Sequence, residues 1–73
     1  MDPMYDRKVI ENIREYIIKN NLSVKKIGDE TGIGYHRLWS ILDRSKSIKL
    51  SDYVSICNAC CEPMDYFLPE KGV

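Results

Sequence analysis

The stretch Val24–Asp43, VKKIGDETGIGYHRLWSILD, decides the fold of this chain. It has small residues at Gly28 and Gly32, and apolar residues recur at helical spacing at Ile27, Ile33, Leu38 and Ile41. This spacing predicts two short helices that cross steeply around a tight turn, a helix-turn-helix. We predict helices over residues 24–31 and 35–43, with Gly32 in the left-handed conformation that ends the first of them.

Three further helices are expected around this pair. Apolar residues on one side of a 3.6-residue period indicate helices over about residues 5–19 and 51–60. Pro63 favours the first turn of a short fifth helix, and Pro69 marks its end. The 73 residues are therefore expected to form one all-α, five-helix domain, 1–73. The expected inward residues are Val9, Ile10, Ile13, Ile17, Leu38, Ile41, Leu42, Tyr53, Ile56, Cys57 and Cys60.

The basic and acidic residues are equal in number over the whole chain, but they are distributed unevenly along it. Eleven basic residues match eleven acidic ones, which argues against a protein that coats nucleic acid by bulk electrostatics. Between Lys19 and Lys49, seven basic residues stand against three acidic ones, an excess of four positive charges. The excess coincides with the helix-turn-helix, as a phosphate-facing surface would require; a solvated basic face is the alternative.

The three cysteines, Cys57, Cys60 and Cys61, crowd one predicted helix. An odd number on one element cannot form a disulfide framework, so we expect Cys57 and Cys60 to pack as small apolar side chains. Metal binding and redox sensing are the alternatives, but the single histidine, His36, lies on another predicted helix. We expect no metal.

The chain also lacks the patterns of several other protein classes. No apolar run approaches the roughly 18 residues that cross a bilayer, and the start lacks a secretory signal, so we expect a cytoplasmic protein without a membrane partner. No nucleophile is paired with a base, and no glycine-rich phosphate loop follows a strand. We therefore expect neither an enzyme nor a cofactor.

Four strings, in this order and spacing, carry a resemblance to a known family: LSVKKIG (22–28), TGIGYHRL (31–38), ICNA (56–59) and MDYFL (64–68). Over about residues 13–68 the chain resembles the Cro and phage-repressor (Xre-like) helix-turn-helix family. The resemblance implies a lambda-repressor-like DNA-binding domain that acts as a sequence-specific transcriptional regulator. Two departures bear on the fold: Gly28 stands where alanine is commoner, which permits a close helix crossing, and Cys61 occupies a usual glycine position.

The resemblance also implies which residues meet DNA. The first two turns of the helix over 35–43 would read base edges, through Tyr35, His36, Arg37 and Ser40. The phosphate contacts would come from Ser23, Val24, Lys25, Lys26, Arg44, Lys46 and Lys49. Alternatively, His36 is only a surface histidine and Tyr35 packs beside Ile33. Three roles stay open for Trp39: covering the edge of the core, contacting DNA and contacting a protein partner.

The expected partner is double-stranded DNA, bound by a homodimer on a two-fold operator with half-sites roughly 34 Å apart. The family often pairs through its C-terminal end, so the dimer candidates are Met64, Tyr66, Phe67 and the tail Pro69–Val73. The alternative hypothesis is an antitoxin-like or inhibitor-like protein-interaction module on the same fold. It would hold another protein through Trp39, Tyr35 or the C-terminal aromatic residues.

Overall fold

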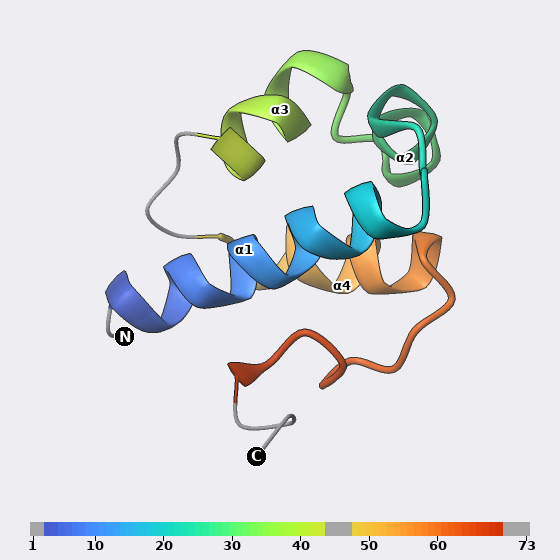
Figure 1. The fold of residues 1–73 in the computed structure, drawn as a ribbon. Coiled ribbons are helices and arrows are strands. Elements are labelled where there is room, and N and C mark those ends of the chain that lie inside the picture. The colour runs from blue at the N-terminus through green and yellow to red at the C-terminus, as the bar shows by residue number, and fades with distance from the viewer. Residues whose placement is uncertain (1–2, 44–47, 70–73) are drawn as a thin grey trace.

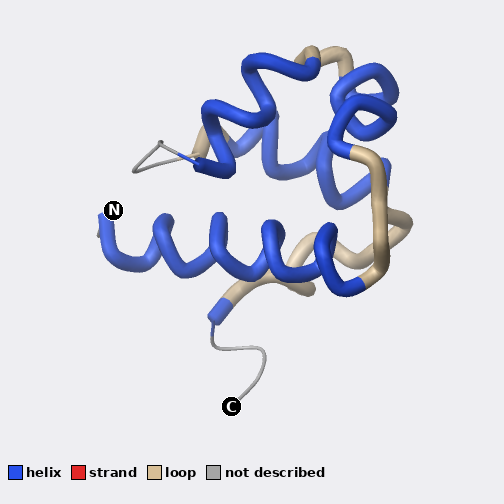
Figure 2. The backbone as a smooth tube through the Cα atoms, turned by 45° about the horizontal axis from the view of Figure 1, so that its top comes forward, coloured by secondary structure: helices blue, strands red, loops and turns tan. Residues whose placement is uncertain are grey.

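The computed structural model describes residues 3–43 and 48–69, and these contain four helices and no strand. The α2–α3 pair lies on one side of α1, and the chain that follows α4 runs back along the other side (Figures 1 and 2). The expected all-α class is confirmed, and the bounds of α2 and α3 agree with the predicted ones. The helices are α1 (Pro3–Lys19), α2 (Val24–Thr31), α3 (Tyr35–Asp43) and α4 (Leu50–Ala59).

The turn between α2 and α3 depends on glycine backbones. Gly32 ends α2 in the predicted left-handed conformation, with φ 77°. Gly34 has φ 93°, and its N–H donates to the Gly28 carbonyl at 3.1 Å. A Cβ atom added at Gly28 would lie only 2.9 Å from the carbonyl carbon of Gly34. The absence of a side chain at Gly28 therefore allows the close crossing that was expected.

Thr31 closes the same turn with its side chain, a role that the sequence did not reveal. Its hydroxyl donates to the Ile27 carbonyl at 2.8 Å and accepts the N–H of Ile33 at 3.2 Å. The second of these bonds gives a partner to a backbone N–H that lies beyond the end of α2. Ile33 is thereby held where its side chain packs, partly buried, against the core.

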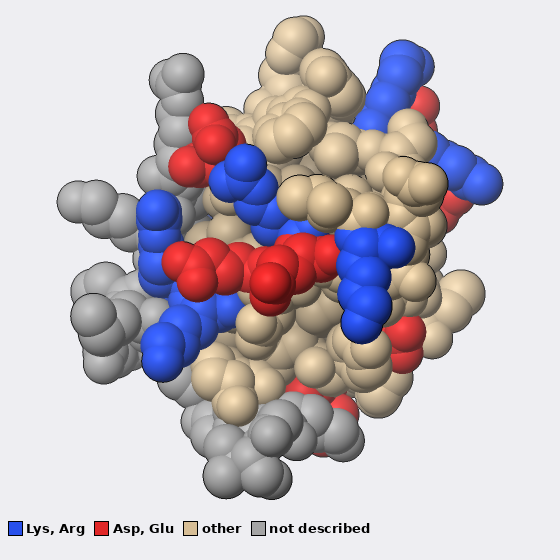
Figure 3. All heavy atoms as spheres, in the orientation of Figure 1, with Lys and Arg blue, Asp and Glu red and all other residues tan. Residues whose placement is uncertain are grey.

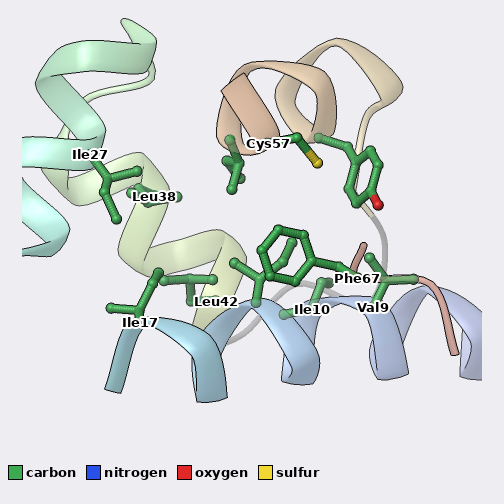
Figure 4. Packing of buried hydrophobic residues seen from close by; sticks show 11 residues of the cluster. Val9, Ile10, Ile17, Ile27, Leu38, Leu42, Cys57 and Phe67 are labelled. Carbon is green, nitrogen blue, oxygen red and sulfur yellow. The ribbon is translucent and has the colours of Figure 1, made fainter. Parts of the chain in front are cut away.

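The core fills the space between α1, α3 and α4 (Figure 4). Every residue that was expected to point inward is buried, except Cys60, which is half-buried. Burial of these apolar side chains is the main favourable contribution to folding. Two acidic residues, Asp6 and Asp52, are also buried, and they were not among the residues expected to point inward.

The predicted fifth helix is wrong. After α4, the described chain forms turns over residues 64–67, with backbone bonds from Tyr66 to Pro63 (3.1 Å) and from Leu68 to Asp65 (3.2 Å). The Phe67 side chain, 1% exposed, packs into the core close to Ile10 and Val9 (Figure 4). Anchoring Phe67 there holds this short segment in four-residue turns rather than in a helix.

No helix in the described part of the chain is both long enough and apolar enough to cross a membrane.

We expect Gly28→Ala to destabilise the protein. Alanine favours a helix by about 1 kcal/mol over glycine, but crowding against a backbone that cannot move aside costs about 1–3 kcal/mol. The free energy of unfolding, measured by urea denaturation, should fall by up to roughly 2 kcal/mol. Glu30→Ala, at an exposed position of the same helix, is the control and should change it little. A stabilised Gly28→Ala would show that the contact with Gly34 is not restrictive.

Candidate nucleic-acid interface

The four residues predicted to read bases are all exposed at the start and along the outer side of α3. Leu38, Ile41 and Leu42 face the core, which leaves Tyr35, His36, Arg37 and Ser40 outside. A shallow hollow of about 350 Å³ on this side is lined by His36, Trp39, Ser40 and Asp43. The hydroxyl and imidazole groups of this face are donors and acceptors suited to base edges.

The start of α2 is capped as predicted. The Ser23 hydroxyl accepts the N–H of Lys26 at 3.2 Å. The amides of Val24 and Lys25 are among the first of the helix, for which an α-helix has no internal acceptor. They lie where an anion would be favoured by the helix dipole.

Both lysines of α2 pair with acidic residues one turn later. Lys25 Nζ lies 3.7 Å from Asp29, and Lys26 Nζ lies 4.0 Å from Glu30. All four side chains are exposed, and the lysine precedes the acid, which is the weaker order for such a pair. Exposed pairs of this kind contribute little, so a phosphate group can compete for the lysines.

The remaining predicted phosphate contacts follow α3. Lys49 is exposed and forms the N-cap position of α4, without a side-chain capping bond. Arg44 and Lys46 lie outside the described residues.

Arg37 is tied to a residue that the sequence analysis did not select. Its Nη2 atom donates to Oδ2 of Asp52, in the first turn of α4, at 2.9 Å. A signal was present: Asp52 stands four residues before Ile56, so it falls on the inward stripe of α4, where a carboxylate requires a partner. The pair links the predicted reading helix to α4.

The charge pattern in space differs from the pattern along the sequence. Asp52 brings a negative charge to Arg37, whereas Arg14 of α1 brings a positive charge to Asp43, 3.5 Å away. Figure 3 shows acidic and basic side chains intermingled over α1 and mostly uncharged side chains over α3. Part of the central positive excess belongs to Arg44 and Lys46, beyond the described residues.

Trp39 lies at the edge between the core and the outer side of α3, with 37% of its surface exposed. It borders a hollow of about 310 Å³ between α1 and α3. Ile18, 66% exposed, and Leu22, 37% exposed, also line this hollow. The result is an apolar surface beside the candidate interface.

The C-terminal dimer candidates differ in exposure. Met64 and Tyr66 are exposed. Phe67 lies in the core and offers no surface to a second copy, contrary to the prediction. Pro69 is half-buried, and the rest of the tail, 70–73, lies outside the described residues.

The cysteines are free, and they differ in their surroundings. Burial raises the pKa of the Cys57 thiol, and burial together with nearby acidic groups raises the pKa of Cys60 to about 11. Cys61 is exposed, with φ 58°, in the left-handed region that favours glycine. No cluster of three or more possible metal ligands occurs within residues 3–43 and 48–69.

No protein-family model matches this chain, and no curated protein or solved structure matches it either.

We expect one thiol per chain to react quickly with a disulfide reagent at pH 8. The thiolate is the reactive form, and with a pKa of about 11 only about one in a thousand Cys60 thiols is ionised at that pH. The reaction of Cys60 should accelerate as the pH rises toward 11. Cys61→Ser should remove the fast phase, and urea should make all three wild-type thiols reactive. Three equally fast thiols in the native protein would contradict the packing of Cys57 and Cys60.

Proposed function

We propose that this chain is a sequence-specific DNA-binding transcriptional regulator of the Cro and phage-repressor type. One observation carries the proposal. The close contact of Gly28 with Gly34 directs the outer side of α3 away from the core, so that Tyr35, His36 and Ser40 are open to a partner. A short helix presented in this way has the dimensions that the major groove admits.

The start of α2 supports the same function. Its Ser23 cap, its first amides and its exposed lysines are suited to phosphate oxygens. In the proposed complex these groups set the position of the protein on the duplex, and the α3 side chains choose the sequence. The weak pairs that Lys25 and Lys26 make are exchanged for phosphates on binding.

The proposed regulator binds as a homodimer. Two copies related by a two-fold axis would place their α3 helices in successive turns of the major groove, roughly 34 Å apart. Met64 and Tyr66 are exposed large apolar side chains of the C-terminal segment and are available for the pairing surface. The DNA sequence selected by such a dimer is palindromic.

The test is selection of bound sequences from a random pool of DNA duplexes at low salt. We expect one preferred motif, with an affinity that falls steeply as salt rises because counterions are released. His36→Ala and Ser40→Ala should each weaken binding to that motif several-fold, since a single hydrogen bond contributes about 0.5–1.5 kcal/mol. Both variants should bind unrelated DNA as the wild type does.

Ser55→Ala is the matched control for Ser40→Ala. It removes a serine hydroxyl from α4 instead of α3. Within the described residues, this hydroxyl donates only to the Ser51 carbonyl of its own helix, at 3.0 Å. This variant should retain the affinity of the wild type. If the wild type selects no sequence, or binds DNA without any salt dependence, the proposed function is wrong.

A protein-interaction module is a second candidate, and the apolar hollow beside Trp39 favours it. Exposed Ile18, Leu22 and Trp39 lie together around this hollow, and aromatic residues in such places often dominate protein binding. In that case the partner is another protein, as for an antitoxin or an inhibitor.

For this second function we expect Trp39→Ala to weaken capture of a protein partner from the producing cells by tenfold or more, a typical loss for a central aromatic residue. Leu50→Ala removes a side chain that is 73% exposed on another helix and serves as the control. Equal capture by wild type and Trp39→Ala would rule out a partner held through this hollow.

A further inference from the structure

The ion pair between Arg37 and Asp52 joins an exposed group to an enclosed one. Asp52 Oδ2 accepts a bond of 2.9 Å from Arg37 Nη2. The Asp52 side chain is only 12% exposed, whereas that of Arg37 is 50% exposed. The carboxylate is thus nearly sealed between α3 and α4, while half of the Arg37 side-chain surface, in the first turn of α3, is open to solvent.

This pair is more persistent than the other ion pairs near the candidate interface. A carboxylate that is largely enclosed loses most of its hydration, so withdrawal of Arg37 removes from Asp52 the charged partner that offsets this cost. The pairs of Lys25 and Lys26 have no such constraint, because water replaces the lost partner. A ligand can therefore draw away the lysines but must take Arg37 where Asp52 holds it.

The bond to Asp52 leaves the guanidinium able to bind a second group. A guanidinium has five N–H donors, arranged so that two of its edges each present a parallel pair. Within the described part of the chain, Arg37 makes only the one bond to Asp52. That bond occupies one edge through Nη2, and the other edge keeps both of its donors.

We propose that Asp52 is a positioning residue that orients Arg37 to read guanine. This inference rests on the proposed function, that α3 reads DNA. Held by Asp52, the guanidinium presents its free edge beside the start of α3, and two parallel N–H donors match O6 and N7 of a guanine in the major groove. Because the side chain is already ordered before binding, little further conformational entropy is lost on contact.

The experiment compares the sequences selected from random DNA duplexes by wild type, Asp52→Asn and Asp29→Asn. The last two variants lose the same negative charge, but Asp29 is an exposed residue of α2 that pairs with Lys25. Both should bind unrelated DNA somewhat more tightly than the wild type. Only Asp52→Asn should lose preference for guanine at one position of each half-site, by at least fivefold, with the other positions unchanged.

Arg37→Lys is the second variant, and it keeps the positive charge beside Asp52. Lysine lacks the two parallel donors, so the same guanine preference should be lost while the salt dependence of binding is retained. Thermal unfolding of each variant shows whether it is folded before its DNA preferences are compared. If Asp52→Asn does not fold, a guanine preference that Arg37→Lys retains still overturns the inference.

The possible failures can be told apart. If the wild type selects no sequence, the proposed function and this inference are both wrong. If the wild type selects a motif and either Asp52→Asn or Arg37→Lys keeps its preference at every position, only the inference is overturned. A uniform loss of affinity at all positions in the folded variants also overturns it, because that result indicates a phosphate contact or a purely structural pair.

Discussion

The rest of the structure depends on the backbone contact between Gly28 in α2 and Gly34 before α3. The Gly34 N–H meets the Gly28 carbonyl at 3.1 Å, and an added Cβ at Gly28 would stand 2.9 Å from the Gly34 carbonyl carbon. Because main-chain atoms make this contact, no change of side-chain rotamer can relieve crowding there. This contact sets the angle at which α3 crosses α2. It therefore also sets which side of α3 packs into the core and which side, starting at Tyr35, is exposed.

Ion pairs between helices then shape the electrostatics of that outer side. Asp52 comes from an acidic flank of the sequence yet lies against Arg37, and Arg14 from the other flank lies 3.5 Å from Asp43. One pair adds a negative charge beside α3 and the other adds a positive one, so their effects on net charge cancel. Under the proposed function, attraction to DNA comes from the lysines around α3, and discrimination comes from its hydrogen-bonding groups.

The C-terminal segment contributes to the core rather than extending the helical array. The Phe67 ring packs edge-on against the Tyr16 ring, with centroids 5.4 Å apart. The backbone carbonyl of Phe67 accepts a hydrogen bond of 2.9 Å from the Asn12 side chain. The Tyr16 hydroxyl donates to Glu62 at 2.8 Å, which ties a second point of the segment to α1. With Phe67 inside, a proposed dimer would have to use the exposed side chains that surround it.

The sequence by itself determined the local structure: the bounds of α2 and α3, the left-handed Gly32, the Ser23 cap and the buried stripes. Each of these depends on backbone preferences and hydrogen bonds within a few residues, or on a helical period. The exposure of the predicted α3 residues follows from the same period. Only the tertiary structure decided that Phe67 fills the core instead of continuing a helix, and that Asp52 meets Arg37 across 15 residues. Those outcomes depend on how separate elements pack in three dimensions, and no local preference encodes that packing.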